Sequence, residues 1–157
     1  PLGVTWTLFL IGVGLTVGNY IGGRLADWRL GTALAGIFLG LAVGSSLVRW
    51  SSPSLIPVEI NLFLWAMVSF AAVPGLQVNV MIFGKAAPNL VATLNIGAFN
   101  VGNALGAWVG GSVISAGFGL QAVPLAAGVL ALTAVLAMRV SMRLAGDETT
   151  SPAVAVA

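Results

Sequence analysis

The sequence contains no cysteine and no histidine. Their absence excludes disulfides, Cys/His metal sites, thiol nucleophiles and histidine general bases, so we expect no cofactor and no enzymatic activity. Charge is also scarce, since 6% of the 157 residues are charged and 59% are hydrophobic. Soluble domains carry about 25% charged residues. The composition therefore predicts an integral membrane protein, and the few basic residues form no patch typical of nucleic-acid binding.

Long stretches of the chain carry no charge at all, and a membrane-spanning helix needs about 20 mostly apolar residues. They predict an all-α polytopic bundle of five spans, at residues 3–23, 30–49, 58–84, 89–116 and 119–139. The segment 117–119 (Gly-Phe-Gly) is the expected turn between the last two spans. We expect the bundle to occupy residues 1–140, and residues 141–157 to form a disordered cytoplasmic tail.

The distribution of basic residues predicts the orientation, because Lys and Arg concentrate in cytoplasmic loops. Arg49 is the one basic residue expected on the opposite side of the membrane. The basic residues expected together on the cytoplasmic side are Arg24, Arg29, Lys85, Arg139 and Arg143. The sequence therefore predicts a multi-pass protein of the cytoplasmic (inner) membrane with its C-terminus in the cytoplasm.

Glycine recurs every fourth residue in three of the predicted spans. The repeats are Gly14, Gly18 and Gly22, then Gly36, Gly40 and Gly44, and finally Gly102, Gly106 and Gly110, which Ala98 precedes. Small residues four apart let the backbones of two membrane helices approach closely. The spacing fits either static helix packing or a seam between helix bundles that move.

A charged segment, "GNYIGGRLADWRLG" (residues 18–31), joins the first two predicted spans. Asp27 is placed to cap the second span, where a carboxylate satisfies free backbone N–H groups. Arg24 and Arg29 flank Asp27 closely enough to pair with it. Two interpretations stay open: a cap with ordinary cytoplasmic arginines, or a charge cluster that stabilises one of two conformations.

This segment resembles the cytoplasmic signature loop of the major facilitator superfamily, G-x-L-a-D-R-x-G-R-R. Gly23, Leu25, Ala26 and Asp27 match the signature, whereas Trp28 stands in place of its first arginine. Such a degenerate copy is typical of the loop between helices eight and nine. The resemblance implies a gating role for Gly23, Arg24, Asp27 and Arg29.

The segment "GNALGAWVGG" (residues 102–111) resembles the helix-five signature of the drug:proton antiporter branch, G-x-x-x-G-P-x-x-G-G. Gly102, Gly106, Gly110 and Gly111 are in register, and Ala107 replaces the proline. Helix eleven is the counterpart of helix five, so the chain would be a C-terminal fragment covering helices eight to twelve of a twelve-helix transporter. The wider pattern resembles arabinose-efflux and chloramphenicol-resistance permeases.

Two spans carry residues suited to lining a cavity. Phe63, Met67, Phe70 and Gln77 share one helical face with Pro74 and Met81, and the next span carries Asn95, Asn100 and Asn103. Each set has two interpretations. The aromatic and methionine face either lines a substrate cavity or packs against helices, and the amides either bond across helices or contact substrate and water.

The resemblance implies transport of a small molecule by alternating access, with proton-coupled efflux of a drug or metabolite as the expected activity. No predicted span has a charged residue near its centre, so the proton-coupling carboxylate would belong to a missing N-terminal half. The expected partners are a small-molecule substrate, protons, the lipid bilayer and that half. Alternatives are a sugar or metabolite importer or facilitator of the same fold, or a non-transporting membrane subunit or inactive fragment.

Overall fold

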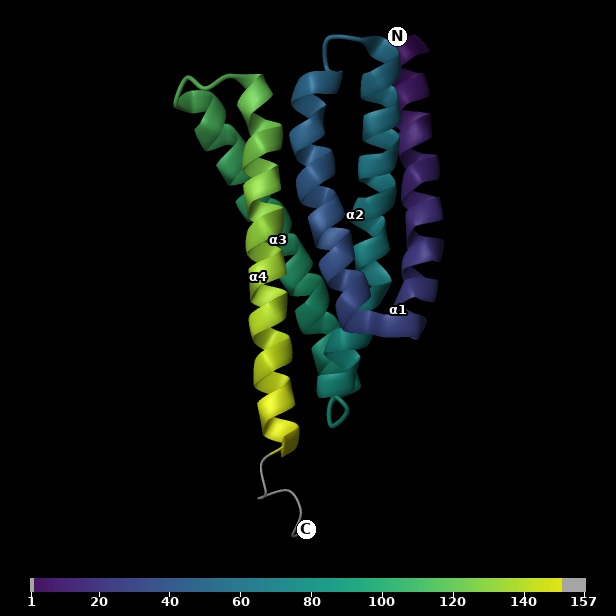
Figure 1. Ribbon diagram of the computed structural model, residues 1–157, viewed down its shortest axis with the longest axis vertical. Coiled ribbons are helices and arrows are strands. Elements are labelled where there is room, and N and C mark those ends of the chain that lie inside the picture. The colour runs from purple at the N-terminus through teal and green to yellow at the C-terminus, as the bar shows by residue number, and fades with distance from the viewer. Residues whose placement is uncertain (1, 151–157) are drawn as a thin grey trace.

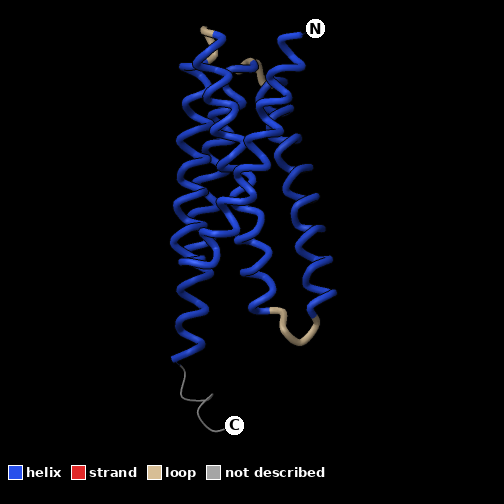
Figure 2. Tube along the Cα trace, turned by 90° about the vertical axis from the view of Figure 1, so that its right-hand side faces the viewer, coloured by secondary structure: helices blue, strands red, loops and turns tan. Residues whose placement is uncertain are grey.

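The computed structural model describes residues 2–150 as a bundle of long helices. The elements are α1 (Leu2–Ser51), α2 (Leu55–Phe83), α3 (Pro88–Ser115), the short 3-10 helix η1 (Leu120–Ala122) and α4 (Val123–Thr150). Within these residues there is no strand, and the loops lie at the two ends of the bundle (Figure 2). Four helices are long and apolar enough to cross a membrane. The prediction of an all-α polytopic bundle is confirmed.

The predicted count of five separate spanning helices is wrong. Residues 3–23 and 30–49 belong to one helix, α1, so the described chain has four candidate spanning helices. The charged segment between them is itself helical, and helical geometry is interrupted at Arg29 (φ −153°, ψ 83°). Asp27 therefore lies inside α1 and does not cap a separate helix. The charged segment correctly predicted where the first long apolar stretch is interrupted. It did not predict that the segment itself would be helical up to Arg29.

At this break α1 reverses direction, so that its two halves run side by side (Figure 1). In the first half Gly14 lies against Phe63 of α2 and Gly22 lies against Ala71, so this half runs parallel to α2. The second half runs antiparallel to α2, since Gly40 faces Val68 and Gly44 faces the earlier Trp65. A straight 50-residue helix would rise about 75 Å, against about 30 Å of hydrocarbon. The reversal lets both apolar halves occupy the same bilayer.

Other element boundaries follow local sequence. α3 begins at Pro88, where a missing N–H costs nothing. The predicted turn before α4 is confirmed, and its glycines adopt positive φ, at 85° for Gly117 and 75° for Gly119. α4 continues to Thr150, so residues 141–150 of the expected disordered tail are helical. Residues 151–157 lie outside the described chain.

The five basic residues predicted to share one side are found together. The break in α1, the turn between α2 and α3 and the end of α4 lie at one end of the bundle, and Arg49 lies toward the other (Figure 1). Both halves of α1 pack against α2. Along α3, Asn95 is the one buried residue in the described chain. α3 therefore leaves most of its surface uncovered by the other helices.

Candidate functional site

The residues of the predicted gating group lie at the end of the first half of α1. The Arg24 guanidinium carbon lies 5.1 Å from the centroid of the Tyr20 ring, within range of a cation–π contact. Asp27 is exposed and makes no ion pair within the described residues, so the expected pairing with its arginines is not formed. Gly23 is half-buried, and exposed Arg29 occupies the break. The group is present at one end of the bundle, and its charged side chains are exposed.

The first glycine repeat forms the closest helix contact. Gly14, Gly18 and Gly22 are buried against α2. A Cβ added at Gly14 would lie 2.7 Å from the Phe63 carbonyl oxygen, and one at Gly18 would collide with the backbone of Met67. Close backbone approach, which the spacing predicted, therefore holds for this repeat.

The glycine repeat of α3 behaves differently, although its spacing is the same. A Cβ added at Gly102, Gly106 or Gly111 would meet nothing within 4 Å, and one at Gly110 would lie 3.6 Å from Val123 Cγ1. The helix-packing motif predicted on α3 is thus uncovered within the described chain except at Gly110. Its packing role remains a prediction about contacts beyond these residues.

The residues of α2 that were predicted to line a cavity do not share one environment. The carbonyl groups of Phe63 and Met67 face the glycines of α1, and Phe70 is 42% exposed. Gln77 lies farther along α2, where it contacts α3. α2 is helical through Pro74, so the proline does not interrupt the span. In the described chain the first part of this face serves helix packing.

Two of the predicted polar residues meet in a hydrogen bond. Asn95 Nδ2 of α3 donates to Gln77 Oε1 of α2 at 2.6 Å, and Asn95 is 9% exposed. Of the two interpretations of the amides, bonding across helices therefore holds for Asn95. Asn100 and Asn103 are exposed, and within the described residues they make no hydrogen bond. The structure does not bring them to the Gln77–Asn95 pair.

A cavity of about 440 Å³ adjoins Asn95 between α2, α3 and α4. Its polar lining includes Asn79 and Ser141, which our sequence analysis did not single out. Asn79 lies two residues after Gln77 and so falls on another face of α2, where the periodic pattern gave no signal. Amide and hydroxyl groups in an apolar wall can hydrogen-bond a neutral molecule without supplying charge.

At the other end of the bundle, further polar contacts join the helices. Thr7 Oγ1 donates to Glu59 Oε1 at 3.3 Å, and Trp65 Nε1 donates to Ser45 Oγ at 3.0 Å. These bonds tie each half of α1 to α2. They help to fix the fold, and Glu59 is the one ionisable group among them.

Comparison with known proteins identifies relatives among membrane transporters. The chain is 43% identical over 143 residues to the inner membrane transport protein YdhP of Escherichia coli K12, covering 91% of this chain and 37% of that protein. Two Bacillus subtilis proteins named uncharacterized MFS-type transporters also match. YtbD is 32% identical (80% of this chain, 32% of that protein), and YfhI is 28% identical (73% and 29%).

The chain thus spans about a third of the length of these relatives. No protein-family model matches it, and neither does any solved structure. The names of these relatives describe membrane transport, and the four long apolar helices indicate a multi-pass membrane protein.

Proposed function

We propose that this chain forms part of the second six-helix half of a major facilitator superfamily transporter that moves a small molecule by alternating access. The observation that carries the proposal is the 43% identity to an inner membrane transport protein over 91% of the chain. In this assignment the two halves of α1 correspond to helices eight and nine, and α2, α3 and α4 to helices ten, eleven and twelve. The basic end of the bundle would then face the cytoplasm.

The substrate that best fits these residues is apolar or neutral, and proton-coupled efflux is the direction we propose. The uncharged side chains that α2 and α3 offer to a substrate are aromatic, methionine and amide groups, among them Phe70, Gln77 and Asn95. Charged residues lie toward the helix ends or the break in α1. A membrane-embedded carboxylate for proton coupling would therefore come from the remainder of the transporter.

Reconstitution of the full-length protein in liposomes tests this function. We expect an outward-directed flux of an apolar fluorescent dye that depends on an imposed pH gradient. Asp27→Asn should lower the turnover several-fold while the amount of folded protein stays unchanged, because the carboxylate is proposed to bias the gate. Asp27→Glu, which keeps the charge, is the control.

Other results would contradict parts of the proposal. Gradient-driven uptake of a sugar or metabolite would favour the importer of the same fold, and a full-length protein without flux of either kind would favour a non-transporting subunit. If Asp27→Asn reduces only the amount of folded protein, the residue is structural and the gating assignment fails.

A further inference from the structure

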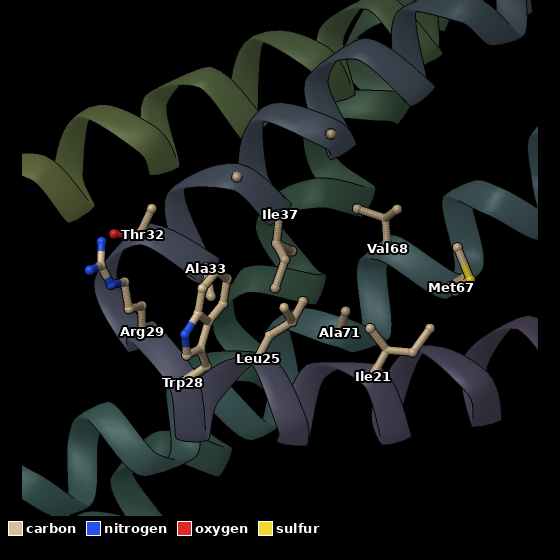
Figure 3. Close-up of a pocket in the computed structure, with 12 residues that line it drawn as sticks. Ile21, Leu25, Trp28, Arg29, Thr32, Ala33, Ile37, Met67, Val68 and Ala71 are labelled. Atoms are coloured by element: carbon tan, nitrogen blue, oxygen red, sulfur yellow. The ribbon is translucent and has the colours of Figure 1, made fainter.

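A second cavity, of about 420 Å³, lies between the two halves of α1 and is floored by α2 (Figure 3). Its walls are almost wholly aliphatic, and Ile21, Met67 and Ala71 lie toward one end of it. Trp28, Arg29 and Thr32 lie at the other end. The cavity is therefore apolar along its length and cationic at one end.

The cavity continues along the second half of α1. A neighbouring cavity of about 490 Å³ shares Gly36, Gly40 and Val68 with the first and extends to Leu47. From Arg29 to Gly40 the first cavity runs roughly 17 Å along the helix, at 1.5 Å per residue. One leaflet of a bilayer is about 15 Å of hydrocarbon, half of its full thickness. The two cavities together form a groove along α1 that is long enough for an acyl chain of one leaflet.

The polar end of the groove lies where a lipid headgroup would be. Trp28 is 76% exposed, and amphipathic tryptophan rings favour the headgroup level. Arg29 and Arg24 are exposed and flank one carboxylate, Asp27, so positive charge predominates on this part of α1. Met142 of α4 lies against Gly31, which brings the neighbouring Arg143 close to the same end.

We propose that this groove binds an anionic phospholipid, with its phosphate at Arg29 and one acyl chain along the glycine-lined wall of α1. Basic pockets between membrane helices bind anionic headgroups, and each basic residue near the surface strengthens such binding. Open space lies beside Gly36, where an added Cβ would meet nothing within 4 Å. This site lies apart from the Gln77–Asn95 pair and needs no assignment of the transported substrate.

Quenching of Trp28 by brominated lipids tests the proposal in the full chain, reconstituted in phosphatidylcholine bilayers. The difference between the wild type and Trp28→Phe isolates the emission of Trp28 from that of the other tryptophans. Brominated phosphatidylglycerol should quench this emission with an association constant about five-fold above that of brominated phosphatidylcholine, the contribution expected from one basic residue.

Two pairs of variants separate the headgroup contact from the acyl-chain contact. Arg29→Gln should abolish the preference for phosphatidylglycerol, whereas Lys85→Gln, which removes a charge at the same end outside the groove, should keep it. Gly36→Leu should reduce quenching by both brominated lipids, whereas Gly12→Leu, at another open position of α1, should not. If Arg29→Gln fails to fold, Arg29→Lys should retain the preference and Asp27→Asn should increase it.

The remaining outcomes overturn the proposal. Equal quenching by both brominated lipids would show that the groove does not select anionic headgroups. Absence of quenching by either lipid would show that protein covers the groove in the full chain. Absence of transport together with the expected quenching would contradict the proposed function and leave the lipid site standing, so the two proposals fail independently.

Discussion

At the scale of single residues, two glycines of the same helix differ in the space around them. Gly18 faces the backbone of Met67, so that an added Cβ would collide with it, whereas Gly12 has nothing within 4 Å. Both positions are helical, so replacing either glycine with alanine changes helix propensity by the same amount. The difference in effect between the two substitutions therefore measures the packing of α1 on α2.

We expect Gly18→Ala to lower the free energy of unfolding by about 1–3 kcal/mol, the usual cost of overpacking. Gly12→Ala should leave it unchanged or raise it by up to about 1 kcal/mol, since alanine favours helix. Thermal unfolding of the purified protein in detergent measures both effects. Equal midpoints for the two variants would contradict the contact between Gly18 and Met67.

The bond between Asn95 and Gln77 can be tested by a double-mutant cycle with Asn95→Leu and Gln77→Met. Interhelical hydrogen bonds in membrane proteins contribute about 0.6 kcal/mol on average and up to about 1.7 kcal/mol, so we expect a coupling energy in that range. Unfolding in mixed micelles supplies the energies. A parallel cycle with Asn103→Leu in place of Asn95→Leu should give no coupling, because Asn103 is exposed, and equal couplings would argue against the pair.

At the scale of elements, the charge-free stretches predicted the apolar helices well because hydropathy acts locally. They could not predict that residues 24–28 would stay helical, since the break depends on how both halves of α1 pack on α2. The end of α4 illustrates the same limit. The polar composition of residues 141–150 favours disorder, yet α4 includes them.

The reversal of α1 has a direct topological consequence. Gly3 and Ser52 should lie on one side of the membrane and Asp27 on the other, whereas a straight helix would separate Gly3 from Ser52. Single cysteines at these positions can be labelled without background, because the chain contains none of its own. We expect a membrane-impermeant maleimide to label Gly3→Cys and Ser52→Cys in intact cells, and Asp27→Cys only after permeabilisation.

A reversed result, with Asp27→Cys labelled from outside and the other two protected, would overturn the orientation but keep the reversal of α1. Labelling of Gly3→Cys and Ser52→Cys from opposite sides would contradict the reversal itself. Ser52→Lys is an independent control. Trypsin added outside intact cells should cleave at this lysine if the residue lies on the same side as the labelled Ser52→Cys.

At the scale of the whole molecule, equal glycine spacing has different consequences on α1 and α3. Spacing determines which residues share a helical face, but the neighbour that covers this face depends on contacts distant in sequence. For that reason the pattern predicted the close contact of Gly18 correctly and gave no warning that Gly106 would be open. The pairing of Gln77 with Asn95 is equally long-range, so each amide was predictable as a candidate but not as a partner of the other.

The uncovered glycine face of α3 leads to a final prediction. If the remainder of the proposed transporter packs on this face, Gly106→Leu in the full-length protein should reduce the proposed transport several-fold or lower the melting temperature, because leucine would separate the helices. Gly97 is the matched control. It is also open, and nine residues of helix place it about 180° around α3 from Gly106. Gly97→Leu should therefore have little effect on transport or melting, and equal tolerance of both leucines would show that the α3 glycine face contacts lipid.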